Sequence, residues 1–143
     1  MEASVSEPLR TNPVGSGRIL IVEDDPSTAQ SLSRILQRAG YQTTVCYNGT
    51  GALRVADADG TTHAAAMVDI HLPDLNGLVI TQKLRERLGP HVPIIVVSGD
   101  TSMETLNSLA HVGATYFLSK PTSPHVLLKM VGDCIGEAER RAG

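Results

Sequence analysis

Acidic, hydroxyl and basic side chains follow four separate apolar segments of this chain. They share one position, at or just beyond the end of an apolar run: Glu23, Asp24 and Asp25 after residues 18–22, Asp69 after 64–68, Ser98 after 93–97, and Lys120 after 114–118. If the runs are parallel strands, these side chains meet at one edge of a sheet, where open α/β sheets bind ligands. Carboxylates suit a divalent cation, and a hydroxyl and an ammonium suit a phosphoryl group. The residue types therefore predict a phosphate and metal site.

Strand-like runs alternate with helical patterns from Arg18 onward. The expected strands cover residues 18–22, 42–46, 64–68, 93–97 and 114–118, and the expected helices cover 26–39, 50–58, a segment from the 72–77 turn to 88, 102–112, and a last helix from Ser123. This alternation is typical of an α/β fold with one doubly wound, five-stranded parallel sheet and helices on both faces.

The expected helix ends carry the residues that usually cap helices. Asp25 is a good N-cap before Pro26 at the first helical position, and Gly40 follows the end of that helix. Gly89 and Pro90 end the helix that runs to residue 88. Taken alone, Asp25 could be a plain helix cap and Asp69 an ordinary turn residue.

Composition limits the classes of protein that fit. The 143 residues are 41% hydrophobic and 19% charged, as expected for one globular domain, and a net charge of -3 gives no global basic field for nucleic acid. We expect no direct nucleic-acid binding and no membrane span. Cys46 and Cys134 lack metal or disulfide-scaffold spacing, which favours reduced thiols in the cytoplasm.

The chain divides into two expected parts. Residues 1–17 contain prolines, glycines and acids without an apolar signal region, so we expect a flexible tail there. Residues 18–141 form the expected domain. We expect no output domain after the last helix, because few residues follow it.

Four segments resemble the receiver domain of two-component response regulators, the CheY-like family. They are ILIVEDD, MVDIHLPDLNGL, IIVVSGD and GATYFLSKP, and they occur in the order of the family. The resemblance covers about residues 18–140. It implies a flavodoxin-like (β/α)5 fold with strand order 2-1-3-4-5, and a signalling module rather than an enzyme. It also implies a histidine kinase or a histidine phosphotransfer protein as the phosphoryl donor.

The resemblance assigns roles at the acidic edge. Asp69 would accept the phosphoryl group, and Lys120 would neutralise one of its oxygens. Mg²⁺, or Mn²⁺ in its place, would be bound directly by Asp25 and Asp69, by Asp24 through a water molecule, and by the backbone carbonyl of His71. Such an open oxygen site suits Mg²⁺, which keeps several of its waters.

The resemblance also implies a switch. Ser98 would move toward the phosphoryl group, and Phe117 would turn inward with it. The neighbouring Tyr116 would point to the opposite face, because side chains alternate along a strand. The surface of the fourth helix, fifth strand and fifth helix would then change its affinity for a protein partner, which the sequence does not name.

Three further features follow from the family pattern. His71, two residues after the acceptor, and Asp100, two residues after Ser98, would tune the lifetime of the acyl phosphate. The peptide bond between Lys120 and Pro121 would be cis, which is uncommon for such bonds in general.

Two other classes of protein share parts of this pattern. One is an unphosphorylated pseudo-receiver that acts only through protein contacts. The other is a haloacid-dehalogenase-type phosphohydrolase, which also uses an aspartate nucleophile. That enzyme needs a second aspartate where this chain has His71, so the pattern disfavours it.

Overall fold

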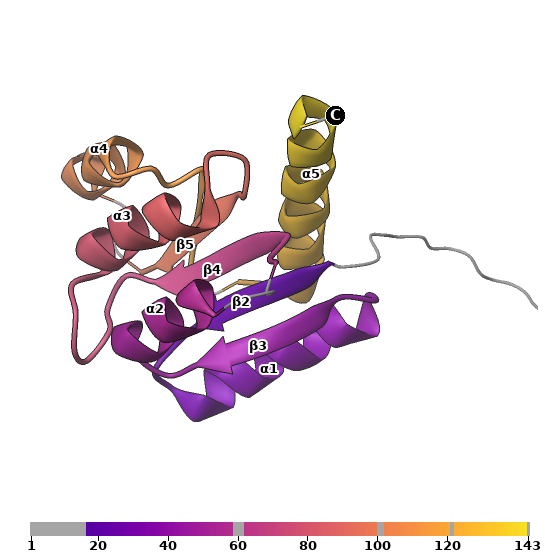
Figure 1. The fold of residues 1–143 in the computed structure, drawn as a ribbon. Helices are drawn as coiled ribbons and strands as arrows, with labels where there is room; N and C mark the ends of the chain where they lie inside the picture. The colour runs from indigo at the N-terminus through magenta and orange to yellow at the C-terminus, as the bar shows by residue number, and fades with distance from the viewer. Residues whose placement is uncertain (1–16, 59–61, 100–101, 121, 143) are drawn as a thin grey trace, which may run out of the picture.

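The computed structural model describes residues 17–58, 62–99, 102–120 and 122–142. In these segments strands and helices alternate (Figure 1), in the order β2 (Arg18–Val22), α1 (Pro26–Arg38), β3 (Gln42–Cys46), α2 (Gly49–Asp57), β4 (Ala65–Asp69), α3 (Gly77–Leu88), β5 (Ile94–Ser98), α4 (Met103–His111), β6 (Tyr116–Ser119) and α5 (Pro124–Ala142). Every expected element is present. Residues 1–16 of the expected tail lie outside the described segments.

The strands form one parallel sheet in the order β3-β2-β4-β5-β6. Counted along the chain this is the order 2-1-3-4-5, so the predicted fold class is confirmed. Asp69 pairs with Val97 of β5, and Ser98 pairs with Ser119 of β6. The carboxyl ends of the central strands therefore lie side by side, as the candidate site requires.

Alternating residues of each strand supply two separate cores, one on each face of the sheet. Ile19 and Ile21 of β2 face α1 and α5, whereas Leu20 and Val22 face α2, α3 and α4. Figure 1 shows these helices in layers on the two sides of the sheet. The strands β4 and β5 are buried along their whole length. Burial on both faces explains their continuous apolar sequence.

The first helix ends one residue earlier than the expected range of 26–39. Ala39 is exposed, whereas Ala29 and Leu36 of α1 are fully buried. The helix ends at Arg38, and Ala39 is its C-cap. Gly40 then adopts a φ of 103°, which turns the chain away toward β3.

The half-buried guanidinium of Arg85 connects the ends of two helices. It donates to the carbonyl of Gly113 through Nε at 3.1 Å and Nη2 at 2.9 Å, and Nη1 donates to the carbonyls of Gly89 and Val92, each at 2.7 Å. Nη2 also donates to the Thr115 hydroxyl at 2.9 Å. Arg85 therefore satisfies carbonyls just past the ends of α3 and α4, at Gly89 and Gly113, and that of Val92 before β5.

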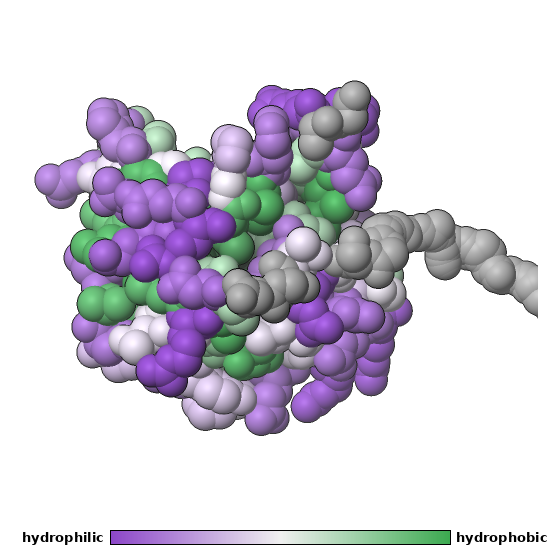
Figure 2. All heavy atoms as spheres, viewed as in Figure 1, coloured by the Kyte–Doolittle hydropathy of each residue, from purple (hydrophilic) through white to green (hydrophobic). Residues whose placement is uncertain are grey.

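Hydrophilic side chains cover most of the face shown in Figure 2, with hydrophobic side chains visible between them. Within the described part of the chain, four large hydrophobic side chains are exposed, each on a different element or loop: Tyr47, Val79, Met103 and Val126. Among the helices of the described segments, none has both the length and the apolar content needed to cross a bilayer.

Candidate functional site

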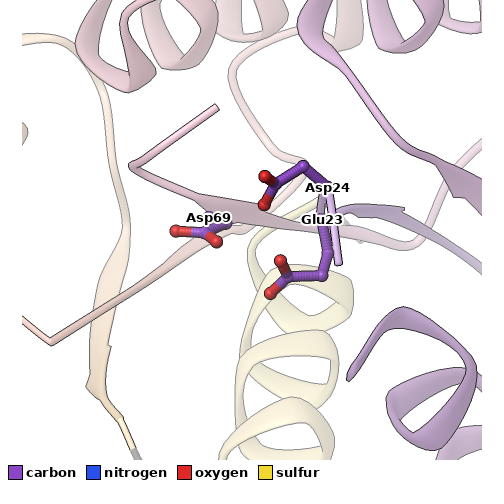
Figure 3. A group of neighbouring side chains, drawn as sticks. All are labelled: Glu23, Asp24 and Asp69. Carbon is purple, nitrogen blue, oxygen red and sulfur yellow. The ribbon is translucent and has the colours of Figure 1, made fainter. Parts of the chain in front are cut away.

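Three carboxylates meet at the carboxyl edge of the sheet. Glu23 and Asp24 follow β2, Asp69 ends the neighbouring strand β4, and one oxygen from each lies within 4.8 Å of the others. Figure 3 shows the three carboxylates directed into one common space. Glu23 is 3% exposed and Asp69 is 5% exposed, whereas Asp24 is exposed. The group therefore has a buried inner wall and an outer side open to water.

Lys120 brings a positive charge into the same group. Its Nζ lies 3.0 Å from Oδ2 of Asp69 and 3.2 Å from Oε1 of Glu23. The backbone N–H of Lys120 donates to the carbonyl of Ser98 at 2.9 Å, which fixes its place beside β5. Partial burial opposes the charged form, but hydrogen bonds and charge from Asp69, with the charge of Glu23, outweigh it and raise the pKa of Lys120. The ammonium is therefore retained at neutral pH.

Glu23 is held firmly although it lies beyond the strand. Its backbone N–H donates to the carbonyl of Cys46 at 3.0 Å, and its Oε2 accepts from the backbone N–H of Asp25 at 3.1 Å. Burial, with a smaller contribution from the charge of Asp69, raises the pKa of Glu23 to about 7. Three carboxylates beside one ammonium leave an excess of negative charge and of oxygen ligands. This donor set fits a hydrated divalent cation.

Asp25 lies outside this carboxylate group. Its Oδ2 accepts hydrogen bonds from the backbone N–H of Thr28, at 3.0 Å, and from the Thr28 hydroxyl. The side chain is thus the N-cap of α1, and these hydrogen bonds lower the pKa of its carboxyl. The structure places the acidic pair at Glu23 and Asp24, one residue earlier than the expected pair Asp24 and Asp25.

The sequence carried a signal for this placement. The segment from Asp25 to Thr28 has the pattern of a helix start. Asp25 is the N-cap, Pro26 is the first helical residue, and the backbone N–H of Thr28 donates to the Asp25 side chain. An aspartate that caps a helix turns toward that helix rather than over the sheet edge. The buried acid Glu23 is the functional candidate to which the sequence reasoning gave no role.

Asp69 is oriented through both of its oxygens. Oδ1 accepts from the backbone N–H of His71 at 3.0 Å, and Oδ2 accepts from Lys120. The exposed His71 lies in the β4–α3 loop, where it forms an antiparallel bridge with Asn76. This loop and Asp24 line a cleft of about 460 Å³. The carbonyl of His71 thus belongs to a loop that borders the carboxylate group.

The expected switch residues lie near the same edge. Ser98 is fully buried at the end of β5. Phe117 packs against the core on the α2, α3 and α4 side, whereas Tyr116 packs on the other side and donates its hydroxyl to Glu137 at 2.8 Å. The two aromatic residues therefore point to opposite faces, as expected. Asp100 and Pro121 lie outside the described residues.

Comparison with known proteins identifies the family. A model of the response regulator receiver domain matches residues 19–132. The chain belongs to this family. The receiver domain is a module of two-component signal transduction, which confirms the expected resemblance.

Curated relatives are mostly longer than this receiver chain. The sensory/regulatory protein RpfC of Xanthomonas campestris is 32% identical over 123 residues, which cover 84% of this chain and 17% of RpfC. The photosynthetic apparatus regulatory protein RegA of Rhodobacter capsulatus is 35% identical over 109 residues, covering 76% of this chain and 58% of RegA. The receiver thus spans less than two thirds of either relative.

Solved structures agree with the fold of this receiver. A CheY-like receiver domain protein from Methanospirillum hungatei has a TM-score of 0.81 and 30% identity, covering 87% of this chain and 98% of its own. A response regulator from Burkholderia pseudomallei has a TM-score of 0.75 and 28% identity, covering 89% of this chain and 73% of its own. The latter structure contains a phosphorylated aspartic acid, a calcium ion and citrate.

Proposed function

We propose that this receiver accepts a phosphoryl group on Asp69 from the phosphohistidine of a sensor histidine kinase or a histidine phosphotransfer protein. One observation carries the proposal. The buried carboxylate of Asp69 is oriented through both oxygens, lies 3.0 Å from the ammonium of Lys120, and shares its space with two further carboxylates. Phosphoryl transfer depends mainly on such positioning and on neutralised charge. The Burkholderia relative, which carries a phosphorylated aspartic acid, supports the same chemistry.

We assign the metal-binding role to Glu23, Asp24 and Asp69, with the backbone carbonyl of His71 as a further ligand. The ion is Mg²⁺, or Mn²⁺ in its place. When bound, it neutralises negative charge on the phosphoryl oxygens. Asp25 keeps its role as helix cap in this proposal, because its carboxylate is already bound to Thr28. This assignment replaces the expected direct ligand Asp25 with acids whose oxygens converge.

The residues of the chain divide the transfer step among them. An oxygen of Asp69 forms a bond to phosphorus while the bond between phosphorus and the histidine nitrogen breaks, and the electron pair of that bond stays on the imidazole. Lys120 neutralises a phosphoryl oxygen from the position it now holds beside Oδ2. The hydroxyl of Ser98 donates to another oxygen once the group is in place. The reaction changes the receiver itself and converts no separate substrate.

The phosphorylated form would bind protein partners through α4, β6 and α5. Leu109 is the buried residue of α4, and the helix contacts the rest of the domain mainly through α3. A helix held by so few buried contacts can shift at low cost in free energy. Phe117 of β6 packs against the core cluster to which Leu109 of α4 belongs, so its inward rotation would alter this surface. We identify the partner only as a protein.

Uptake from a nitrogen-linked donor tests the proposal. The receiver is incubated with phosphoramidate and Mg²⁺, and an acyl phosphate is sought by ³¹P NMR. We expect a signal in the wild type that disappears in Asp69→Asn and after chelation of the metal. Asp133→Asn is the control, because Asp133 lies on α5 in an exposed ion pair with Lys129, away from the carboxylate group. A signal that persists in Asp69→Asn would refute the acceptor. A folded wild type that takes up no phosphoryl group would favour the unphosphorylated pseudo-receiver.

A further inference from the structure

The carboxylate of Asp74 links the β4–α3 loop to the start of α2. Oδ1 accepts from the backbone N–H of Gly49 at 2.9 Å, and Oδ2 accepts from the backbone N–H of Thr50 at 3.0 Å and from its hydroxyl at 2.8 Å. These hydrogen bonds lower the pKa of Asp74 to about 2. The link is therefore a charged contact at neutral pH. It joins parts of the chain that are far apart, because Gly49 precedes Asp74 by 25 positions and Thr50 precedes it by 24.

The helix α2 does not need Asp74 in order to begin. Asn48 is already its N-cap, and Oδ1 of Asn48 accepts from the backbone N–H of Gly51 at 2.7 Å. Asp74 occupies the two remaining N–H groups of the first turn, which attract an anion because of the helix dipole. Because Asp74 comes from a distant loop, its hydrogen bonds to these N–H groups also restrain the position of that loop.

The loop that carries Asp74 also carries the expected metal ligand. It begins after Asp69, and the N–H of Gly77 donates back to the carbonyl of Ile70 at 3.1 Å. A Cβ at Gly77 would collide with that carbonyl, so the loop closes tightly on itself. A Cβ at Gly49 would lie 3.1 Å from Leu75, which shows that the loop also packs against the start of α2. His71 and Asp74 therefore belong to one closed turn, which the carboxylate of Asp74 attaches to the start of α2.

Asp24 faces this turn across the cleft of about 460 Å³, whose lining includes His71 and Asp74. Any displacement of the turn changes the distance between the His71 carbonyl and the carboxylates of Asp24 and Asp69. We propose that Asp74 is a positioning residue for the metal site, which holds the His71 carbonyl in the arrangement that the ion needs. This inference rests on the proposed metal role of the site.

The matched variants are Asp74→Asn and Asn48→Ala. Both weaken the start of α2, but only Asp74→Asn weakens the attachment of the β4–α3 loop, because it removes the negative charge and one of the two acceptor oxygens. The apparent dissociation constant rises in proportion as the fraction of molecules with the competent loop falls. If about 10–30% of molecules keep the loop in place, Mg²⁺ affinity falls by about three- to tenfold in Asp74→Asn. We expect Asn48→Ala to stay within about twofold of wild type, because the loop remains attached.

The experiment has two readouts. Isothermal titration with Mg²⁺ measures affinity, and hydrogen exchange of the Gly77 amide, followed by NMR without metal, reports whether the loop is held. We expect Asp74→Asn to speed this exchange and to weaken Mg²⁺ binding, relative to Asn48→Ala. Equal affinities in the two variants, or equal exchange at Gly77, would overturn the inference. A wild type that binds no Mg²⁺ would instead refute the metal role itself, and this outcome is visible before the variants are compared.

Discussion

Replacing Glu23 by Gln should weaken metal binding far more than replacing Asp25 by Asn. The structure places one oxygen of Glu23 within 4.8 Å of oxygens from Asp24 and Asp69, whereas Asp25 is bound to Thr28 as a helix cap. The change to Gln removes one negative charge while keeping nearly the same shape. The comparison therefore decides which two adjacent acids form the metal-binding pair.

The size of the effect follows from Coulomb's law. Because the three oxygens lie within 4.8 Å of one another, a divalent cation bound among them would lie within about 5 Å of the Glu23 carboxylate. At that distance the cation gains at least ~1.7 kcal/mol from the carboxylate in a medium as polar as water, and about four times as much at an effective dielectric constant of about 20. The smaller value corresponds to a factor of about 20 in dissociation constant. Lys120 remains in the variant with one neutralising partner fewer, which repels the cation further. We therefore expect at least about a tenfold loss of Mg²⁺ affinity.

Isothermal titration with Mg²⁺ at about pH 8 measures this effect, since Glu23, with a pKa of about 7, is then largely ionised. We expect Asp25→Asn to remain within about threefold of wild type, because its carboxylate lies outside the converging group. Circular dichroism checks that both variants are folded. A large loss in Asp25→Asn together with an unchanged affinity in Glu23→Gln would refute the reasoning.

Two further predictions concern stability. Arg85→Met leaves the carbonyls of Gly89, Val92 and Gly113 without this donor, so the free energy of unfolding, measured by urea denaturation, should fall by about 2–4 kcal/mol. Arg87→Met is the control; it breaks an exposed ion pair with Asp57 and should lower the free energy of unfolding by less than about 1 kcal/mol. Similar losses in both variants would contradict this role of Arg85. Burial, and secondarily the charge of Arg18, lower the pKa of His63, whose Nε2 has no hydrogen-bond partner within the described part of the chain. The His63 imidazole therefore binds a proton more readily in the unfolded chain than in the folded domain. Its contribution to the free energy of unfolding is complete above about pH 6.5 and is lost as the pH falls below that value. When the pH is lowered from about 7.5 to 5.5, His63→Gln should lose less stability than wild type. An identical pH dependence in His63→Gln would rule this out.

The sequence was sufficient to predict the order and type of the elements. Strands such as β4 and β5 are short, continuous apolar runs, and their burial on both faces requires such runs. The sequence therefore predicts that the carboxyl ends of these strands meet at one edge of the sheet, and the structure places Asp69 and Ser98 at that edge. The side of the sheet faced by Phe117 followed from simple alternation.

The parts that sequence reasoning missed depend on local direction or on distant contacts. The choice between Glu23 and Asp25 depends on where β2 ends and where the cap of α1 begins, a shift of a single residue. The roles of Arg85 and Asp74 come from contacts with residues more than 20 positions away. No periodicity or motif in one sequence encodes such pairs, because each depends on how two loops meet in the folded domain.

The most direct test of the central claim is intact mass spectrometry after incubation with acetyl phosphate and Mg²⁺. The wild type should gain one phosphoryl adduct, and the adduct should disappear in Asp69→Asn and without divalent metal. The adduct should persist in Asp133→Asn, whose site is unchanged. No adduct on a folded wild type, or an adduct retained in Asp69→Asn, would contradict the assignment of this receiver as a metal-dependent phosphoacceptor.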